Sequence, residues 1–205
     1  MMDYSWKKTK EYIHADIYRN FGKFTKKMVI MLLLSNSTVA MLLYFRICQY
    51  CLYHRKNLLI YIVHIFSYIR FKHIQIKCGI ELNQHTIIGY GLRIPHRGNI
   101  IIHPSTIIGN NCEIMQNVTI GNNILKDRDG VAKIGNNVLI CAGAKIIGKI
   151  DIASCVVIGA NAVVNNNIPE KSIVAGVPAR VINNLYNNNY LINMYEINIG
   201  ENKND

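Results

Sequence analysis

Hydrophobic and polar positions follow two different periods along the chain. From residue 1 to about 75, apolar and aromatic residues recur at three- and four-residue intervals, as in Asp16–Phe21, Val29–Leu34 and Leu42–Tyr53. This spacing predicts a helical N-terminal domain, 1–75, built from several short helices. Met28–Ile47 is nearly long enough to span a membrane, but its polar centre predicts two helices that meet at Asn36.

From residue 76 to 182 the period becomes six. Aliphatic residues recur in three phased runs, with Gly directly after several of them. The runs are Leu82, Ile88, Ile94, Ile100; then Ile102, Ile108, Ile114, Ile120; then Ile134, Ile140, Ile146, Ile152, Ile158, Val164. A period of six is typical of a hexapeptide-repeat parallel β-helix, in which each short strand places one aliphatic residue inside a narrow prism. We expect Gly and Asn at the corners, where the backbone can require positive φ.

Two segments depart from the repeat. The polar, charged segment 122–132 is out of register, so we expect it to protrude as a loop that carries function. The Asn-rich segment 183–205 has no repeat, and we expect a loose C-terminal tail.

The positive charge is concentrated in the N-terminal third. Residues 1–77 hold thirteen Lys and Arg against three Asp and Glu, and the remainder holds ten against nine. No nucleic-acid-binding module is recognisable, so we expect no nucleic-acid partner. The basic helices are compatible with a solvated face or with peripheral contact to a membrane. The expected location is the cytoplasm, with membrane association left open.

The cysteines and histidines do not form a recognisable metal site. Cys48 and Cys51 have the spacing of a metal pair, but no second pair follows at zinc-site spacing. We interpret all six cysteines as reduced and structural, and we expect no metal. His85, His96 and His103 do not match the pattern of a metal-using β-helix enzyme.

The segment from Gly79 to Ile182 resembles the serine acetyltransferase branch of the hexapeptide-repeat acyltransferases. This segment covers about half of the chain, and four stretches in it carry the resemblance: Ile88 to His96, Ile114 to Gly121, Ala142 to Gly148 and Ala175 to Arg180. The basic N-terminus resembles the shorter members found with surface-polysaccharide genes. The resemblance implies a left-handed parallel β-helix preceded by a small α-helical domain, and transfer of acetyl from acetyl-CoA.

The resemblance assigns His96 as general base and Glu81, fifteen residues earlier, as the acid that orients it, although the best-known members have Asp there. The chemistry is consistent, because histidine titrates near neutral pH and can take a proton from a hydroxyl that attacks a thioester. A carboxylate on the other ring nitrogen would fix the tautomer and stabilise the imidazolium.

The same resemblance maps the acetyl-CoA site onto a groove between subunits, since the family is usually trimeric and some members pair trimers. The corresponding small residues are Ala142, Gly143 and Ala160. Lys145 and Arg180 are candidates to meet the CoA phosphates.

The acceptor site departs from the family pattern. Pro95 stands where serine acetyltransferases have Asp, and the loop has Arg128 but lacks the histidine that follows it in the family. Asp16 is the nearest candidate for an acceptor-binding Asp in the helical domain. Because lost charge partners disfavour an amino acid, we expect a sugar hydroxyl of a surface polysaccharide as acceptor. The alternatives are serine O-acetylation in cysteine biosynthesis and a non-catalytic trimeric scaffold.

Overall fold

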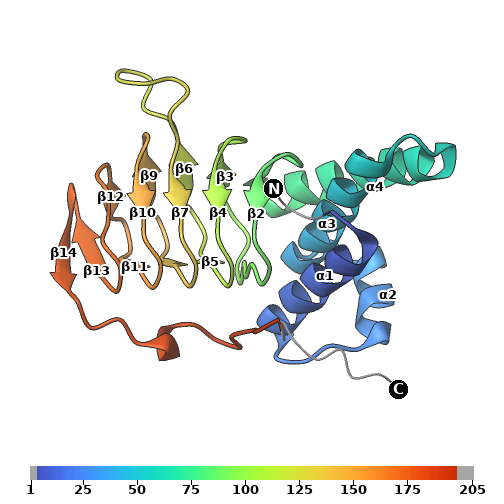
Figure 1. Ribbon diagram of the computed structural model, residues 1–205, viewed down its shortest axis with the longest axis horizontal. Coiled ribbons are helices and arrows are strands. Elements are labelled where there is room, and N and C mark those ends of the chain that lie inside the picture. Colours follow the sequence, from blue (N-terminus) through green and yellow to red (C-terminus); the bar gives the residue numbers. More distant parts are fainter. Residues whose placement is uncertain (1–3, 198–205) are drawn as a thin grey trace.

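The computed structural model describes residues 4–197, which form a helical domain followed by a long prism (Figure 1). The four helices are α1 (Trp6–Phe21), α2 (Lys26–Leu34), α3 (Thr38–His54) and α4 (Leu58–Cys78). Each begins at a polar N-cap whose side chain accepts a hydrogen bond from the first turn. The helical domain extends three residues beyond the predicted boundary, because α4 continues to Cys78 and ends at Gly79 in the left-handed conformation.

The predicted break at Asn36 is confirmed. α2 ends at Leu34 and α3 begins at Thr38, with Ser37 as its N-cap. Among the described residues, no single helix is long and apolar enough to cross a membrane, and the pair α2–α3, bent by 96°, meets that test by length and composition. Most of α3 is buried inside the protein, which accounts for its apolar character.

The prism is a left-handed parallel β-helix with three sheets, as predicted. Sheet 1 contains β1 (Ile80–Glu81), β3 (Ile100–Ile102), β6 (Thr119–Gly121), β9 (Lys145–Ile147) and β12 (Val163–Val164). Sheet 2 contains β2 (Ile87–Ile88), β4 (Ile107–Ile108), β7 (Lys133–Ile134) and β10 (Asp151–Ile152). Sheet 3 contains β5 (Glu113–Ile114), β8 (Leu139–Ile140), β11 (Val157–Ile158), β13 (Ile173–Gly176) and the antiparallel β14 (Ala179–Asn183).

The six-residue repeat fills the interior of the prism. In sheet 2, Ile88, Ile108 and Ile134 pair in register and are all buried. Their neighbours Ile87 and Ile107 point outward. Fully burying one such side chain contributes about 1.5–3 kcal/mol, so the repeated column is the main source of stability.

The corners are formed by two kinds of residue. Asn111, Asn137 and Asn161 adopt positive φ values of 53°, 58° and 56°. Gly109 has ordinary φ, but a Cβ there would lie 2.5 Å from the backbone oxygen of Gly135 in the next coil. The corner asparagines therefore supply the left-handed conformation, whereas Gly109 allows the coils to stack closely.

The loop and the C-terminal segment leave the prism on different sides. β6 ends at Gly121 and β7 begins at Lys133, and the intervening residues project from the prism (Figure 1). The C-terminal segment, which the sequence predicts to be loose, instead packs along the prism as far as residue 197. Tyr186 donates a hydrogen bond to the backbone oxygen of Asn137, and Leu191 is buried against sheet 3. Its aromatic and aliphatic residues explain this packing.

Candidate functional site

His96 lies in a turn at one edge of the prism, where the chain passes from sheet 3 to sheet 1. The buried Ile94 fixes one side of the turn, and Ile100 fixes the other. Gly98 and Asn99 have positive φ values of 117° and 44°, which let the chain reverse in a short distance. The N–H of Gly98 donates to the backbone oxygen of Cys78, so the turn is anchored while the His96 side chain is exposed.

The linker between α2 and α3 contacts the same turn. Thr38 Oγ1 donates to the backbone oxygen of Ile94 at 2.8 Å. Arg97 Nη2 donates to the backbone oxygen of Asn36 at 3.0 Å. The helical domain therefore lies against the turn that carries the predicted base.

A ladder of backbone hydrogen bonds continues along this edge from the His96 turn. Asn117 N–H donates to Gly98 O, Gly143 N–H to Gln116 O, and Asn161 N–H to Ala142 O, at 2.9, 3.0 and 2.9 Å. The predicted small residues Ala142, Gly143 and Ala160 stand on this ladder. The structure thus places them on the same edge as His96, in the order of the coils.

Gly143 allows successive coils to stack closely at this edge. It has φ of +78°, and a Cβ there would lie 2.0 Å from Oδ1 of Asn161. The glycine is needed for stacking of the coils, and its lack of a side chain also leaves the edge open to a ligand.

The two predicted cationic residues, Lys145 and Arg180, lie at different distances from the His96 turn along the prism. Lys145, on β9, donates from Nζ to the Asn117 backbone oxygen at 2.7 Å and to Thr119 Oγ1 at 3.1 Å. Its ammonium group therefore points back along the prism toward the coil of His96. Arg180, on β14, is exposed at the far end.

Two buried side-chain oxygens next to the His96 turn lack a hydrogen-bond partner within the described part of the chain. They are Oδ1 of Asn36, in the α2–α3 linker, and Oε1 of Gln116, in the adjacent coil. Gln116 Cβ lies 4.0 Å from the position that a Cβ on Gly98 would take. Because a buried unpaired acceptor is costly, both atoms are suited to receive a donor from a ligand. Sequence reasoning missed both, since their position depends on tertiary packing.

Glu81 is exposed on β1, in register with Ile101 of β3. It lines a hollow of about 380 Å³ together with Gln75 at the end of α4 and Asn99 of the His96 turn. No hydrogen bond or ion pair joins Glu81 to His96 in the residues that the structure describes. The two predicted catalytic residues therefore lie near the same turn, but no hydrogen bond or ion pair connects their side chains.

Asp16 faces the protein interior. Arg46 donates to Asp16 Oδ2 from Nε at 2.8 Å, and the N–H of Leu92 donates to Oδ1 at 2.9 Å. The carboxylate is 2% exposed. This geometry does not support the prediction that Asp16 binds the acceptor, because both oxygens are occupied by donors of the protein.

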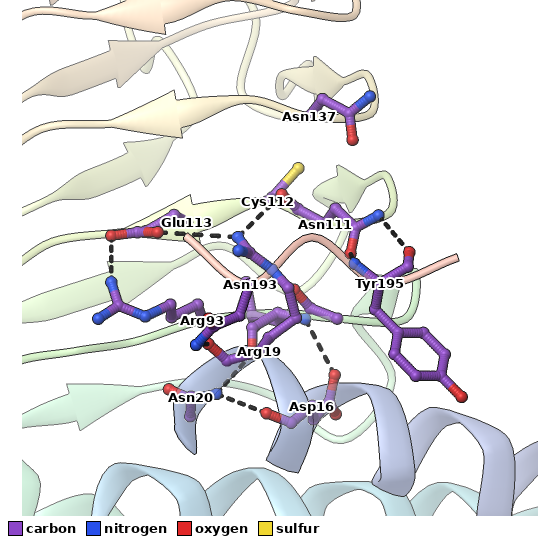
Figure 2. A network of polar contacts seen from close by, with 12 residues as sticks. Asp16, Arg19, Asn20, Arg93, Asn111, Cys112, Glu113, Asn137, Asn193 and Tyr195 are labelled. Carbon is purple, nitrogen blue, oxygen red and sulfur yellow. Dashed lines mark hydrogen bonds and ion pairs between the residues drawn. The ribbon is translucent and has the colours of Figure 1, made fainter. Parts of the chain in front are cut away.

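A second buried charge cluster ties α1 to the prism (Figure 2). Arg19 is fully buried and donates to the backbone oxygen of Gly91, and its Nη2 lies 3.7 Å from Oε2 of Glu113. Arg93 also pairs with Glu113. Asp16 lies three residues after the buried Ile13 on the same helix face, whereas no sequence signal predicted the burial of Arg19.

Arg128 lies at the opposite edge of sheet 1. Its loop joins sheet 1 to sheet 2, whereas the His96 turn joins sheet 3 to sheet 1. Arg128 is exposed at the outside of the loop. Within one chain, the structure does not bring Arg128 and His96 together.

The cysteines are free thiols, and no group of three His, Cys, Asp or Glu side chains within residues 4–197 could hold a metal ion. Burial raises the pKa of Cys48 and of Cys112 to about 12. At neutral pH these two thiols are protonated and serve as small apolar side chains.

Comparisons with known proteins agree on one class. The chain is 33% identical over 129 residues to the serine acetyltransferase of Haemophilus influenzae, covering 63% of this chain and 45% of that protein. It is 41% identical over 104 residues to that of Staphylococcus xylosus, covering 51% and 48%. The chain is serine acetyltransferase-like. No protein-family model matches it.

Solved structures extend this likeness to the helical domain. A serine acetyltransferase in complex with CoA superposes with a TM-score of 0.67 at 26% identity, covering 86% of this chain and 71% of that one. The Neisseria gonorrhoeae serine acetyltransferase in complex with serine gives 0.67 at 26% identity, covering 87% and 71%. The serine acetyltransferase-like chain nevertheless spans about half the length of the curated relatives it matches.

Proposed function

We propose that the protein is an acetyl-CoA-dependent O-acetyltransferase with His96 as general base. The observation that carries the proposal is the edge of the prism on which the turn of the exposed His96 and the corners with Ala142, Gly143 and Ala160 succeed one another, connected by backbone hydrogen bonds from Gly98 to Asn161. The likeness to a serine acetyltransferase in complex with CoA supports acetyl-CoA as the donor.

In the proposed reaction the acceptor hydroxyl loses its proton to His96 while its oxygen attacks the thioester carbonyl of acetyl-CoA. The tetrahedral intermediate collapses with cleavage of the C–S bond. The imidazolium of His96 returns the proton to the departing sulfur, which leaves as CoA. Glu81 would approach His96 when substrates are bound, because catalytic hydrogen bonds often tighten only in the complex.

Acetyl-CoA would lie along the edge of the prism. Backbone groups near Gly143 and Ala160 are accessible there because the side chains are small. Lys145 and Arg180 would meet the phosphates, one near each end of the edge.

L-Serine is the acceptor that the comparisons support best, because the relatives and structural neighbours described above are serine acetyltransferases and one structure contains serine. Asn36 Oδ1 and Gln116 Oε1 have no hydrogen-bond partner among the described residues, and an ammonium group or a hydroxyl of the acceptor would supply donors for them.

A sugar hydroxyl of a surface polysaccharide is the second candidate, and a local observation favours it. Pro95 precedes His96, and Asp16 is occupied by Arg46 and Leu92. Neither position therefore offers a free carboxylate to an amino-acid ammonium group. The unpaired oxygens of Asn36 and Gln116 are neutral, which suits hydroxyl donors.

The proposed site is completed by a neighbouring copy in a trimer. Arg128 and His96 stand at opposite edges of sheet 1, so packing of prisms around a threefold axis would bring the loop of one copy to the His96 edge of the next. We further propose that the reaction takes place in the cytoplasm.

The test measures release of free CoA by the purified chain with acetyl-CoA and either L-serine or a panel of sugars and sugar nucleotides. Turnover with serine alone supports the first acceptor, and turnover with a sugar alone supports the second. His96→Gln should lower kcat by roughly 10²- to 10⁴-fold, whereas the exposed corner variant His85→Gln should be unchanged. Full activity of His96→Gln would exclude this mechanism, and no release with any acceptor would favour a non-catalytic scaffold.

A further inference from the structure

The outer surface of α4 is apolar over most of its length. Leu59, Ile62, Phe66, Ile69 and Ile76 recur at helical spacing, and they are 69%, 55%, 65%, 62% and 83% exposed. The C-terminal half of the helix packs on the protein through its buried Phe71 and Ile74, whereas in the N-terminal half His64 contacts Gln84 of the prism at 3.0 Å. Figure 1 shows the N-terminal half extending away from the prism. A continuous apolar surface of this kind marks an interaction site.

Helix α2 also exposes apolar side chains. Ile30, Met31 and Leu34 are exposed, and Leu34 is 82% exposed. Arg70 of α4 donates from Nη2 to the backbone oxygen of Ser35 at 3.2 Å, which holds the end of α2 beside the middle of α4. We call the exposed apolar residues of α2 and α4 the apolar face.

Apolar grooves adjoin this face on the side of α1. One, of about 370 Å³, is lined by Trp6, Ile47 and Tyr50 together with Leu59 and Val63 of α4. The other, of about 690 Å³, lies between α1 and α2, and its lining includes Lys7, Lys10 and Lys26 against one acid, Glu11. Apolar volume and cationic groups thus occur on the same side of the helical domain.

The charge around the apolar face is mostly positive. The sequence contains no Asp or Glu from Ile17 to Ile80, but it contains ten Lys and Arg there. Lys26 and Lys27 are exposed at the start of α2, and Lys77 at the end of α4. Two copies docked through this face would bring the Lys and Arg side chains together, and these outnumber the neighbouring acids Glu11 and Glu81. An anionic surface would be complementary.

We propose that the apolar face docks on the surface of a bilayer that contains anionic phospholipid. α4 lies in the interfacial plane, with Ile62, Phe66 and Ile69 inserted below the head groups and the lysines beside the lipid phosphates. The basic residues near such a surface are attracted by the lipid phosphates, and the apolar side chains contribute further by burial. The proposed insertion of Ile62, Phe66 and Ile69 uses neither His96 nor the edge that carries it, although Ile76 at the end of the apolar face lines the same hollow as Glu81.

Flotation of the full chain with phospholipid vesicles tests the proposal without acetyl-CoA. The protein should float with vesicles of phosphatidylcholine and phosphatidylglycerol at low salt, and should be released at high salt. Phe66→Ser/Ile69→Ser should weaken partitioning by at least about tenfold, because two inserted apolar side chains are lost. Lys26→Gln/Lys27→Gln should weaken it and reduce its dependence on salt.

The matched control is Leu185→Ser/Ile192→Ser, which changes two exposed apolar residues, 75% and 52% exposed, on the C-terminal segment. It should float like the wild type, and circular dichroism should show all variants folded. Absence of flotation, or equal flotation of wild type and Phe66→Ser/Ile69→Ser, would overturn the proposal. Sedimentation would also overturn the proposal if Phe66→Ser/Ile69→Ser dissociated a larger assembly and the protein bound no vesicles. The apolar face would then contact a second copy of the chain.

Discussion

Arg97 donates a hydrogen bond to the backbone oxygen of Asn36, and this contact connects the His96 turn to the α2–α3 linker. The two segments are sixty-one residues apart in the sequence. The linker therefore lies beside the proposed base, and its position there depends on the exposed Arg97.

Replacing this arginine should alter catalysis more than stability. Arg97→Ala should raise the KM for the acceptor several-fold, because Asn36 loses its tie to the turn, whereas the free energy of unfolding should change by less than about 0.5 kcal/mol. Steady-state kinetics and urea denaturation measure the two effects. Arg55→Ala, an exposed arginine at the end of α3, is the control. A change in stability without a change in KM would contradict the assignment.

Glu81 should act on the rate through His96. Glu81→Gln should lower kcat by roughly 10- to 1,000-fold with little change in the KM for acetyl-CoA, because an amide cannot stabilise an imidazolium. Glu81→Asp should restore part of the rate. A loss of kcat that comes with an equally large rise in the KM for acetyl-CoA, and that Glu81→Asp does not restore, would assign Glu81 a structural role.

The buried pair of Asp16 and Arg46 should be essential for stability. Asp16→Ala leaves the Arg46 guanidinium buried without its counter-ion, which should cost about 3–5 kcal/mol in the free energy of unfolding. Lys8→Ala, which removes a half-exposed ion pair with Glu11, should cost less than about 1 kcal/mol. Urea denaturation compares the two, and equal losses would be inconsistent with the buried pair.

His14 should make stability depend on pH. Burial lowers the pKa of His14, so the unfolded chain binds a proton more readily than the folded one. The stability contributed by neutral His14 is therefore complete above the unfolded value near 6.5, and it declines as pH falls below that value toward the lowered pKa. The Nδ1 of His14 lies 2.6 Å from Tyr195 Oη, so docking of the C-terminal segment should weaken over the same range.

Thermal unfolding of the wild type and His14→Gln between pH 7.5 and 5.5 checks this. The wild type should lose more of its Tm than the variant as pH falls. Identical slopes would show that His14 is not the titrating group.

The fold could be predicted from the sequence because the pattern of aliphatic residues is periodic. Ile88, Ile108 and Ile134 occupy the same place in successive repeats, so each confirms the others, and the break at Asn36 followed from its polar neighbours. The assignment of His96, Ala142 and Ala160 to the site came from the family resemblance and not from the repeat.

Contacts between distant segments could not be predicted in this way. The burial of Arg19 against Glu113 and the unpaired oxygens of Asn36 and Gln116 depend on how the helical domain docks on the first coils. Asp16 shows the difficulty most clearly, because a carboxylate near a site and a carboxylate inside an ion pair look the same in a sequence.

The C-terminal segment leaves β14 at one end of the prism and reaches Tyr195 against His14 and Asn111 at the other. The length of this segment therefore has to match the length of the prism. Coils are spaced about 4.8 Å apart, and an extended residue spans about 3.3 Å. A relative with one more coil would need one or two additional residues in this segment, so repeat number and tail length should change together as the protein evolves.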